Sequence, residues 1–127
     1  MELAYTILYV DNVAASMAFY EAAFGMQRHF LHEGGDWGEM ATGSTKLAFC
    51  SRKLLREMGK TPAAPATQTP CFEIALTTSD VAATVQTATA AGAQLVQAPE
   101  EMPWGQTVAY VADADGFLVE ICTPMGA

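Results

Sequence analysis

The strongest constraint on the fold of this chain is an internal repeat, because two parts of the sequence share both a start and an end. Segment 5–25 aligns with segment 73–93 at a shift of 68 residues, and segment 46–51 aligns with 118–123 at a shift of 72. The matched positions include a helix-capping residue near each start and a cysteine near each end. Repetition of this kind reports a duplicated structural unit, so the sequence predicts two similar modules.

Each copy shows the pattern of a strand, a helix and then three further strands. Apolar and polar residues alternate from Phe72 to Thr77, as they do in a strand. Asn12 and Asp80 are suited to cap the helices that follow, and Gly25 is suited to end the first helix. Extended runs bounded by turn residues then follow at about 26–32, 36–42, 46–51, 94–97, 107–112 and 117–122. The expected fold class is therefore α+β, with two tandem βαβββ modules.

We expect the 127 residues to form one domain, with module one at 1–51, a connector at 52–70 and module two at 71–124. The connector begins with basic residues and continues with Pro, Ala and Thr, which favours a solvated linker. A basic patch for acidic partners is the alternative interpretation of its first part.

Composition excludes several classes of function. The formal net charge is −8 with only six Lys and Arg residues, which argues against nucleic-acid binding. No apolar run approaches the roughly 20 residues that a membrane helix needs, and the N-terminus lacks the basic region of a signal peptide. Three cysteines form no disulfide framework or close metal-type pair, so we expect a cytoplasmic protein in a reducing compartment.

The predicted sheet face opposite the helices is too apolar for plain solvent and still carries carboxylates. In the first module we expect on this face Tyr5, Ile7 and Tyr9 from the first strand and Lys46, Ala48 and Cys50 from the last strand. In the second module we expect Leu118, Glu120 and Cys122 from the last strand. An apolar lining with a few polar groups is typical of a small-molecule site. An open, hydrated face is the alternative.

The double pattern, with the segments LYVDNVAASMAFYEAAFG, GEMATGSTKLAF, PWGQTVAYVADADGF and VEICTP, resembles the vicinal oxygen chelate superfamily. That superfamily groups glyoxalases, extradiol dioxygenases, fosfomycin-resistance enzymes and bleomycin-resistance proteins. The resemblance covers nearly the whole chain outside the connector. It implies a curved mixed sheet that forms a ligand cup, and a homodimer.

The resemblance also implies four metal-ligand positions, which here are occupied by Tyr5, Ala48, Glu73 and Glu120. Ala48 cannot bind a metal and a neutral tyrosine is a poor ligand, so no cofactor is favoured. Two carboxylates and water could still hold a hard divalent cation such as Mg²⁺ or Mn²⁺. The two histidines, His29 and His32, fall on none of these positions.

Without a metal, Glu73 and Glu120 form a candidate catalytic pair. The resemblance implies that the first and last strands of a module are neighbours, and adjacent strands lie about 4.8 Å apart. Two carboxylates so close in a partly dry cup would not readily both ionise, so one pKa should be raised. Such a pair could serve as general base and acid, or could hydrogen-bond a bound molecule.

Aromatic residues complete the candidate site. Trp104 precedes a strand and would either stack on a planar ligand or pack a loop. Tyr110 would add to the aromatic lining. Trp37 and Glu39 lie in the first module, and the sequence does not fix which face of the sheet Glu39 occupies.

Three functions are consistent with these residues. The favoured one is a metal-free dimer that binds a small, partly aromatic molecule, and the negative charge favours a cationic one. The second is a glyoxalase-type lyase or isomerase, or a dioxygenase, with a divalent metal at Glu73 and Glu120. The third is a metal-free enzyme in which the glutamate pair moves protons.

Overall fold

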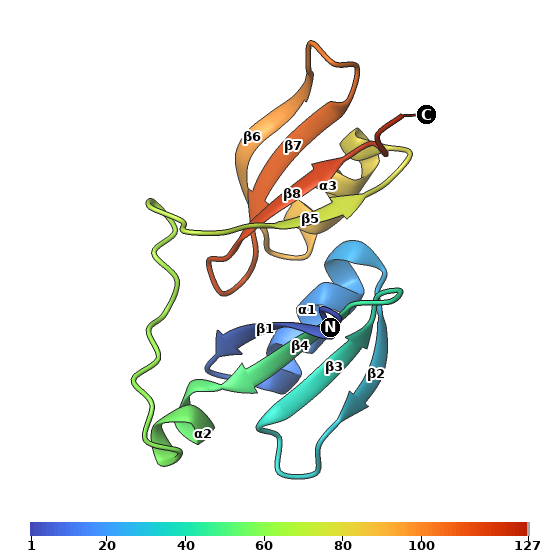
Figure 1. The fold of residues 1–127 in the computed structure, drawn as a ribbon. Coiled ribbons are helices and arrows are strands. Elements are labelled where there is room, and N and C mark those ends of the chain that lie inside the picture. Colours follow the sequence, from blue (N-terminus) through green and yellow to red (C-terminus); the bar gives the residue numbers. More distant parts are fainter. Residues whose placement is uncertain (127) are drawn as a thin grey trace. The chain divides into compact units, whose positions relative to one another are not determined.

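A computed structural model describes residues 1–126, and the chain divides into two compact units, Met1–Ala64 and Pro65–Ala127 (Figure 1). Each unit contains its own four-stranded mixed sheet, so the expected α+β fold with a repeated βαβββ pattern is confirmed. The hydrogen bonds form two separate sheets, one in each unit. No helix within residues 1–126 is long and apolar enough to span a lipid bilayer.

The first unit has the strand order β1-β4-β3-β2. The strand β1 runs parallel to β4, and the other neighbouring pairs are antiparallel. The elements of this unit are β1 (Tyr5–Val10), α1 (Val13–Phe24), β2 (Gln27–Leu31), β3 (Trp37–Ala41), β4 (Lys46–Ser51) and α2 (Arg52–Glu57).

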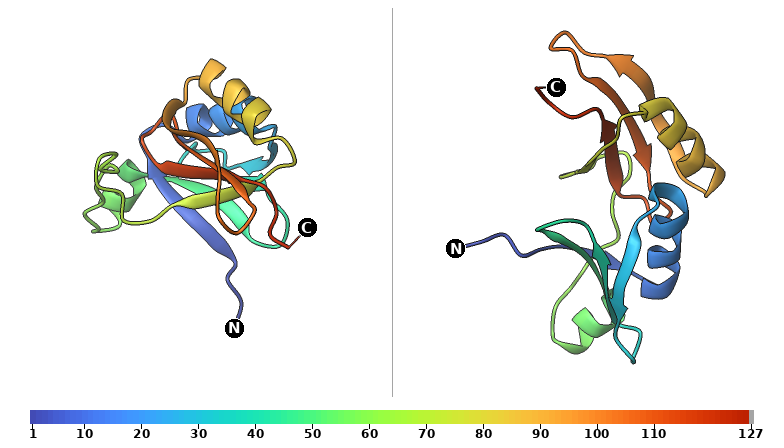
Figure 2. Two further views of the ribbon diagram at one scale, coloured as in Figure 1. Left: turned by 90° about the horizontal axis from the view of Figure 1, so that it is seen from above. Right: turned by 90° about the vertical axis from the view of Figure 1, so that its right-hand side faces the viewer.

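Helix α1 covers one face of this sheet, as Figure 2 shows. The side chain of Asn12 accepts a hydrogen bond of 3.0 Å from the amide of Ala15, which satisfies one of the free N–H groups at the helix start. Gly25 ends the helix in the left-handed conformation, with φ of 66°. Between helix and sheet lies a fully buried core that includes Leu8, Val10, Met17, Tyr20 and Phe49.

The start of the predicted connector is a short helix, α2, in which Lys53 and Arg56 are exposed to solvent as expected but Arg52 is buried. Ser51 caps α2 by accepting a hydrogen bond from the amide of Leu54. Arg52 is only 8% exposed, because its guanidinium donates to the carbonyl of Tyr9 at 2.7 Å and pairs with Asp11 at 2.8 Å. The first basic residue of the connector therefore ties α2 to the end of β1.

The second unit repeats the arrangement, with the strand order β5-β8-β7-β6 and parallel pairing of β5 with β8. Helix α3 covers one face of this sheet (Figure 2). Asp80 caps α3 as Asn12 caps α1, by accepting from the amide of Ala83 at 3.0 Å. The elements are β5 (Ile74–Thr77), α3 (Val81–Ala90), β6 (Gln94–Glu101), β7 (Thr107–Ala112) and β8 (Leu118–Cys122).

The strand expected near 94–97 extends further, to Glu101. Its pairing with β7 shifts register twice, between Leu95 and Gln97 and again between Gln97 and Glu100. The extension includes Pro99, which the sheet tolerates because β6 is an edge strand and a proline there removes no hydrogen bond from a central ladder.

Candidate functional site

The helix-free face of the second sheet carries two carboxylates and a phenol. Glu120 on β8 lies opposite Tyr110 on β7 and opposite Ala75 on β5. Its neighbours in sequence, Val119 and Ile121, are fully buried, so alternation directs Glu120 to the other face. Glu73 lies two residues before Ala75 and shares that face.

Tyr110 links the two carboxylates. Its hydroxyl donates a hydrogen bond of 3.0 Å to Oε1 of Glu120. Burial, the hydrogen bond to Glu120, and the negative charges of Glu120 and Glu73 together raise the pKa of Tyr110 to about 12. The phenol therefore stays protonated near neutral pH and acts as a hydrogen-bond donor.

The carboxyl of Glu73 is electrostatically disfavoured as an anion. Burial and repulsion from Glu120 raise the pKa of Glu73 above its ordinary value, while a hydrogen bond with Tyr110 lowers it in part. The residue as a whole is exposed, so this is a local effect of the second carboxylate and of partial desolvation. The structure thus brings together the two glutamates that the sequence singled out, with Tyr110 beside both.

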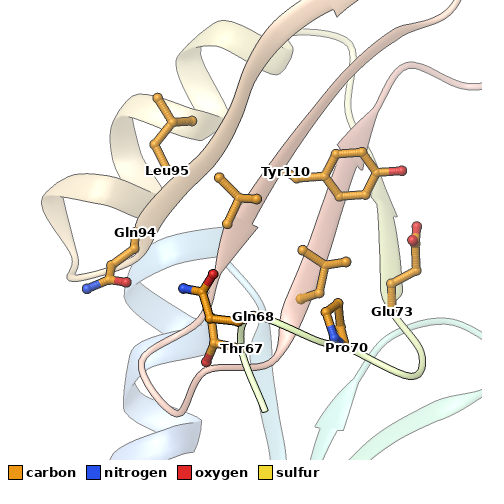
Figure 3. Close-up of a pocket in the computed structure, with 9 residues that line it drawn as sticks. Thr67, Gln68, Pro70, Glu73, Gln94, Leu95 and Tyr110 are labelled. Carbon is orange, nitrogen blue, oxygen red and sulfur yellow. The ribbon is translucent and has the colours of Figure 1, made fainter. Parts of the chain in front are cut away.

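A pocket of about 470 Å³ opens beside this group and lies wholly within the second unit (Figure 3). In Figure 3, the side chains of Glu73 and Tyr110 lie at the same end of the pocket. The lining comes from the end of the connector and from the strands, and comprises Thr67, Gln68, Pro70, Glu73, Gln94, Leu95, Val96, Tyr110 and Leu118.

One wall of the pocket is the connector segment 67–70, which sequence reasoning missed. The hydroxyl of Thr67 donates to the carbonyl of Gly116 at 3.1 Å, in the turn between β7 and β8. Gly116 has φ of 101°, and a Cβ at this position would lie 2.6 Å from the hydroxyl oxygen of Thr67. Glycine therefore allows the connector to lie close to this turn. Only the glycine-containing sequence DADG could have hinted at it.

The sequence-predicted residues of the first unit lie on the helix-free face of the first sheet. Tyr5 pairs with Lys46 in register, and Ile7 pairs with Ala48. Tyr5, Ile7 and Tyr9 are each about 40% exposed, on the side of the sheet away from α1, whereas Ala48 is fully buried.

Glu39 is a buried carboxylate on this same face, opposite Ala48. It is only 5% exposed, and it accepts a hydrogen bond of 2.9 Å from the indole N–H of Trp37. The ammonium of Lys46 lies 3.5 Å from its other oxygen. Glu39 lies opposite Ala48 as Tyr110 lies opposite Glu120, an equivalence that the strand register shows and the sequence repeat does not.

Trp104 lies outside the pocket lining. It is 62% exposed on the turn before β7, and its indole N–H donates to Gln106 at 2.8 Å. Gln106 in turn donates to the carbonyl of Thr123 at 2.6 Å. A ligand contact for Trp104 stays a prediction.

The donor set of the second unit does not fit the metal site that the resemblance implies. It offers two carboxylates and a protonated phenol, whose high pKa makes it a poor ligand. Among residues 1–126, no group of three or more His, Cys, Asp or Glu side chains is close enough to hold a metal ion.

Cys50 and Cys122, at matching positions of the repeat, are both buried. Burial raises the pKa of Cys122, and the charge of Glu120 and a hydrogen bond with it add to this effect. Burial, with the charge of Asp36, also raises the pKa of Cys50. Both thiols are thus unsuited to act as nucleophiles near neutral pH.

Comparison with known proteins agrees with this architecture. The model of the Glyoxalase/Bleomycin resistance protein/Dioxygenase superfamily matches residues 2–121. A search of curated protein sequences found no match to this chain.

Solved structures with the same fold include three that span almost the whole chain. A glyoxalase-related enzyme from Fulvimarina pelagi is 25% identical over 100% of this chain and 94% of that chain, with a TM-score of 0.83. A glyoxalase/bleomycin resistance protein/dioxygenase family enzyme from Burkholderia phytofirmans PsJN is 22% identical over 97% and 98%, with a TM-score of 0.79. TioX from Micromonospora sp. ML1 is 21% identical over 97% and 98%, with a TM-score of 0.74.

Proposed function

Because this chain belongs to the Glyoxalase/Bleomycin resistance protein/Dioxygenase superfamily, we propose that it binds a small, partly aromatic molecule in the pocket of its second unit, without a metal. The observation that carries the proposal is the hydrogen bond from Tyr110 to Glu120, with Glu73 beside both, at one end of that pocket. A few polar groups at one end of a pocket that also has apolar lining residues can orient a small ligand.

The size and lining of the pocket support this proposal. A volume of about 470 Å³ lies within the range of small-molecule sites, roughly 300–1,000 Å³. Leu95 and Val96 on β6 are about half exposed, and Pro70 and Leu118 extend the same apolar lining. A planar or aliphatic body would cover these side chains, while its polar group reaches Tyr110 and the carboxylates.

The direct test is an NMR titration of the isotope-labelled protein with small aromatic amines, alcohols and acids. Binding at this site should shift the backbone amides of residues 67–73, 94–96 and 108–120, and Tyr110→Phe should weaken it. Shifts confined to other parts of the chain, or none with any compound, would contradict the proposal. Metal analysis of the purified protein tests the metal-free part, which a stoichiometric divalent ion would overturn.

We also infer a homodimer in a reducing, cytoplasmic compartment. The half-exposed row of Tyr5, Ile7 and Tyr9 on β1 supports a partner surface, since apolar patches on a monomer are usually small. Three free cysteines, Cys50, Cys71 and Cys122, support the reducing compartment. Light scattering coupled to size-exclusion chromatography tests the dimer, and a mass of 13.5 kDa at micromolar concentration would contradict it.

A second candidate function is catalysis by the glutamate pair, as a lyase or isomerase that transfers protons. The raised pKa of Glu73 favours it, because a general base works best when its pKa lies near the operating pH. Tyr110, protonated and hydrogen-bonded, would donate to an oxygen of the substrate. Turnover of a small oxygenated substrate that Glu73→Gln abolishes, with binding retained, would establish this function over simple binding.

The alternative is a metal-dependent glyoxalase or dioxygenase with Mg²⁺ or Mn²⁺ at Glu73 and Glu120, and the two enzymes can be told apart. Activity would then require added metal and be lost in Glu120→Ala together with the metal.

A further inference from the structure

The two units carry very different sets of charges. Residues 1–64 contain all six Lys and Arg residues and both histidines, together with seven carboxylates. Residues 65–127 contain no Lys, Arg or His. Their acidic residues are Glu73, Asp80, Glu100, Glu101, Asp113, Asp115 and Glu120.

Four of the seven carboxylates in the first unit have cations beside them. The structure shows ion pairs of Glu21 with Arg28, Glu39 with Lys46, Asp11 with Arg52, and Glu57 with Lys53. The second unit has no side-chain cation of its own, so Glu73 and Glu120 cannot form such a pair within it. Their shared neighbour is the neutral hydroxyl of Tyr110.

The pocket therefore combines a negative end with an apolar wall, and its own unit supplies no positive charge. From this combination, which rests on the proposed function and deepens it, we propose that the pocket takes a molecule with a primary ammonium group on an apolar body. The ammonium supplies the positive charge that the unit lacks, and the body covers Leu95, Val96 and Leu118.

Hydrogen-bond stoichiometry favours a primary ammonium over other cations. A primary ammonium has three N–H donors. Glu73 and Tyr110 line the pocket, and the carboxylate of Glu120, hydrogen-bonded to Tyr110, lies next to them as a third acceptor. Tyr110 uses its own hydrogen on Glu120 and keeps its lone pairs for an incoming donor. A quaternary ammonium has no N–H to donate, and a bare Mg²⁺ ion needs about six oxygen ligands.

The test uses four probes that share one aromatic body: benzylammonium, benzyl alcohol, benzyltrimethylammonium and benzoate. Titration into the labelled protein near neutral pH and at low salt, followed by NMR, gives a dissociation constant for each. Benzylammonium should bind at the pocket at least about tenfold more tightly than benzyl alcohol, since a hydrogen bond to a charged group is worth about that factor. Benzyltrimethylammonium should bind more weakly than benzylammonium, and benzoate most weakly.

Matched variants locate the effect. Glu73→Gln and Glu120→Gln should each remove most of the preference for benzylammonium over benzyl alcohol. Glu73 lines the pocket and Glu120 is hydrogen-bonded to the lining residue Tyr110. Glu101→Gln removes the same charge from the same unit at the far end of β6, opposite Thr107, and should retain the preference. If all three variants lose it equally, overall charge and not the pocket selects the cation, which would overturn the inference.

The outcomes separate this inference from the function on which it rests. Benzyl alcohol binding at the pocket as tightly as benzylammonium would overturn the inference and leave the small-molecule pocket in place. No shift at the pocket with any of the four probes would contradict both. Mg²⁺ alone, titrated as a fifth arm, should not displace benzylammonium at equal concentration, and displacement would assign the acidic end to a metal ion instead. Because probe selectivity is measured on the unmodified protein, the result stands even if a variant fails to fold.

Discussion

Tyr110 on β7 donates a 3.0 Å hydrogen bond to Glu120, the residue directly opposite it on β8. The equivalent pair of the first unit is Glu39 on β3 and Ala48 on β4, so the two repeats carry different chemistry at matching positions. In the first unit Glu39 is buried and paired with Lys46. In the second unit Glu120 accepts a hydrogen bond from Tyr110, which lines the pocket, and the unit contains no Lys, Arg or His. The two modules share one fold, and each carries different polar side chains on the helix-free face of its sheet.

Two substitutions around this hydrogen bond should shift the pKa of Glu73 in opposite directions. Tyr110→Phe removes the hydrogen bond that favours the Glu73 carboxylate, so this pKa should rise further above its ordinary value. Glu120→Gln removes the repelling charge, so the pKa of Glu73 should fall toward its ordinary value. Carbon-detected NMR of the Glu73 carboxyl group across the pH range measures both, and shifts of the same sign would contradict the arrangement.

Glu73→Gln should make the folded state relatively more stable as pH rises. A carboxyl whose pKa is raised on folding contributes its full stability below its unfolded pKa and loses it as pH rises through the folded value. Glutamine does not ionise, so it avoids this loss. Because Glu73 is exposed, we expect a gain within about 0.5 kcal/mol. The difference in Tm between variant and parent should grow as pH rises from about 3.5, below the ordinary pKa of glutamate, to about 7, and a constant difference over this range would refute the linkage.

The ion pair of the first unit should respond unequally to loss of each partner. Glu39→Ala leaves the indole N–H of the half-buried Trp37 without its acceptor and opens space at a buried position, and should cost about 1–3 kcal/mol. Lys46→Ala should cost less, about 1 kcal/mol, because the Lys46 side chain is 41% exposed and Glu39 keeps its hydrogen bond. Urea unfolding of the two variants compares these costs, and a larger cost for Lys46→Ala would contradict the assignment of Glu39 as the buried partner.

Helix α1 lies so close to β3 at Gly38 that a larger residue at this position should destabilise the fold. A Cβ at Gly38 would collide with the sulfur of Met17 and lie 3.0 Å from Cγ1 of Val13. Overpacking of this kind costs about 1–3 kcal/mol, so Gly38→Ala should lower the unfolding free energy by that amount. A double-mutant cycle provides the control, because Gly38→Ala should cost much less in a Met17→Ala background. Equal costs in both backgrounds would show that the contact is not the cause.

The hydroxyl of Thr67 should hold the connector wall of the pocket in place. Thr67→Val removes the hydrogen bond to Gly116 and keeps the shape of the side chain. Loss of one such bond is worth about 0.5–1 kcal/mol, so benzylammonium should bind about two- to fivefold more weakly. Amide exchange at residues 67–69 should speed up as well. Thr69→Val, two residues along the same segment, is the matched control and should leave both measurements near those of the parent.

Much of the fold could be predicted from the sequence because its signals are local. Asn12 and Asp80 cap their helices through amides three residues away, and Gly25 ends α1 through its own backbone conformation. These features depend on a few neighbouring residues and do not need the rest of the chain. The repeat then fixed the order of elements twice over. The resemblance to the superfamily then singled out Glu73 and Glu120, because it implies that the first and last strands of a module are neighbours.

The remainder depended on contacts between residues far apart in the chain. Whether Glu39 faces the helix or the opposite side follows from the register of β3 against β4, which a run of five residues does not specify. The burial of Arg52 depends on the carbonyl of Tyr9, 43 residues away, and Thr67 reaches Gly116 across 49. The sequence by itself determined which elements form, because helix capping and hydrophobic periodicity depend only on residues within each segment. Only the tertiary structure decided which side chains meet at the pocket, because register and chain path are settled when the strands and the connector pack together.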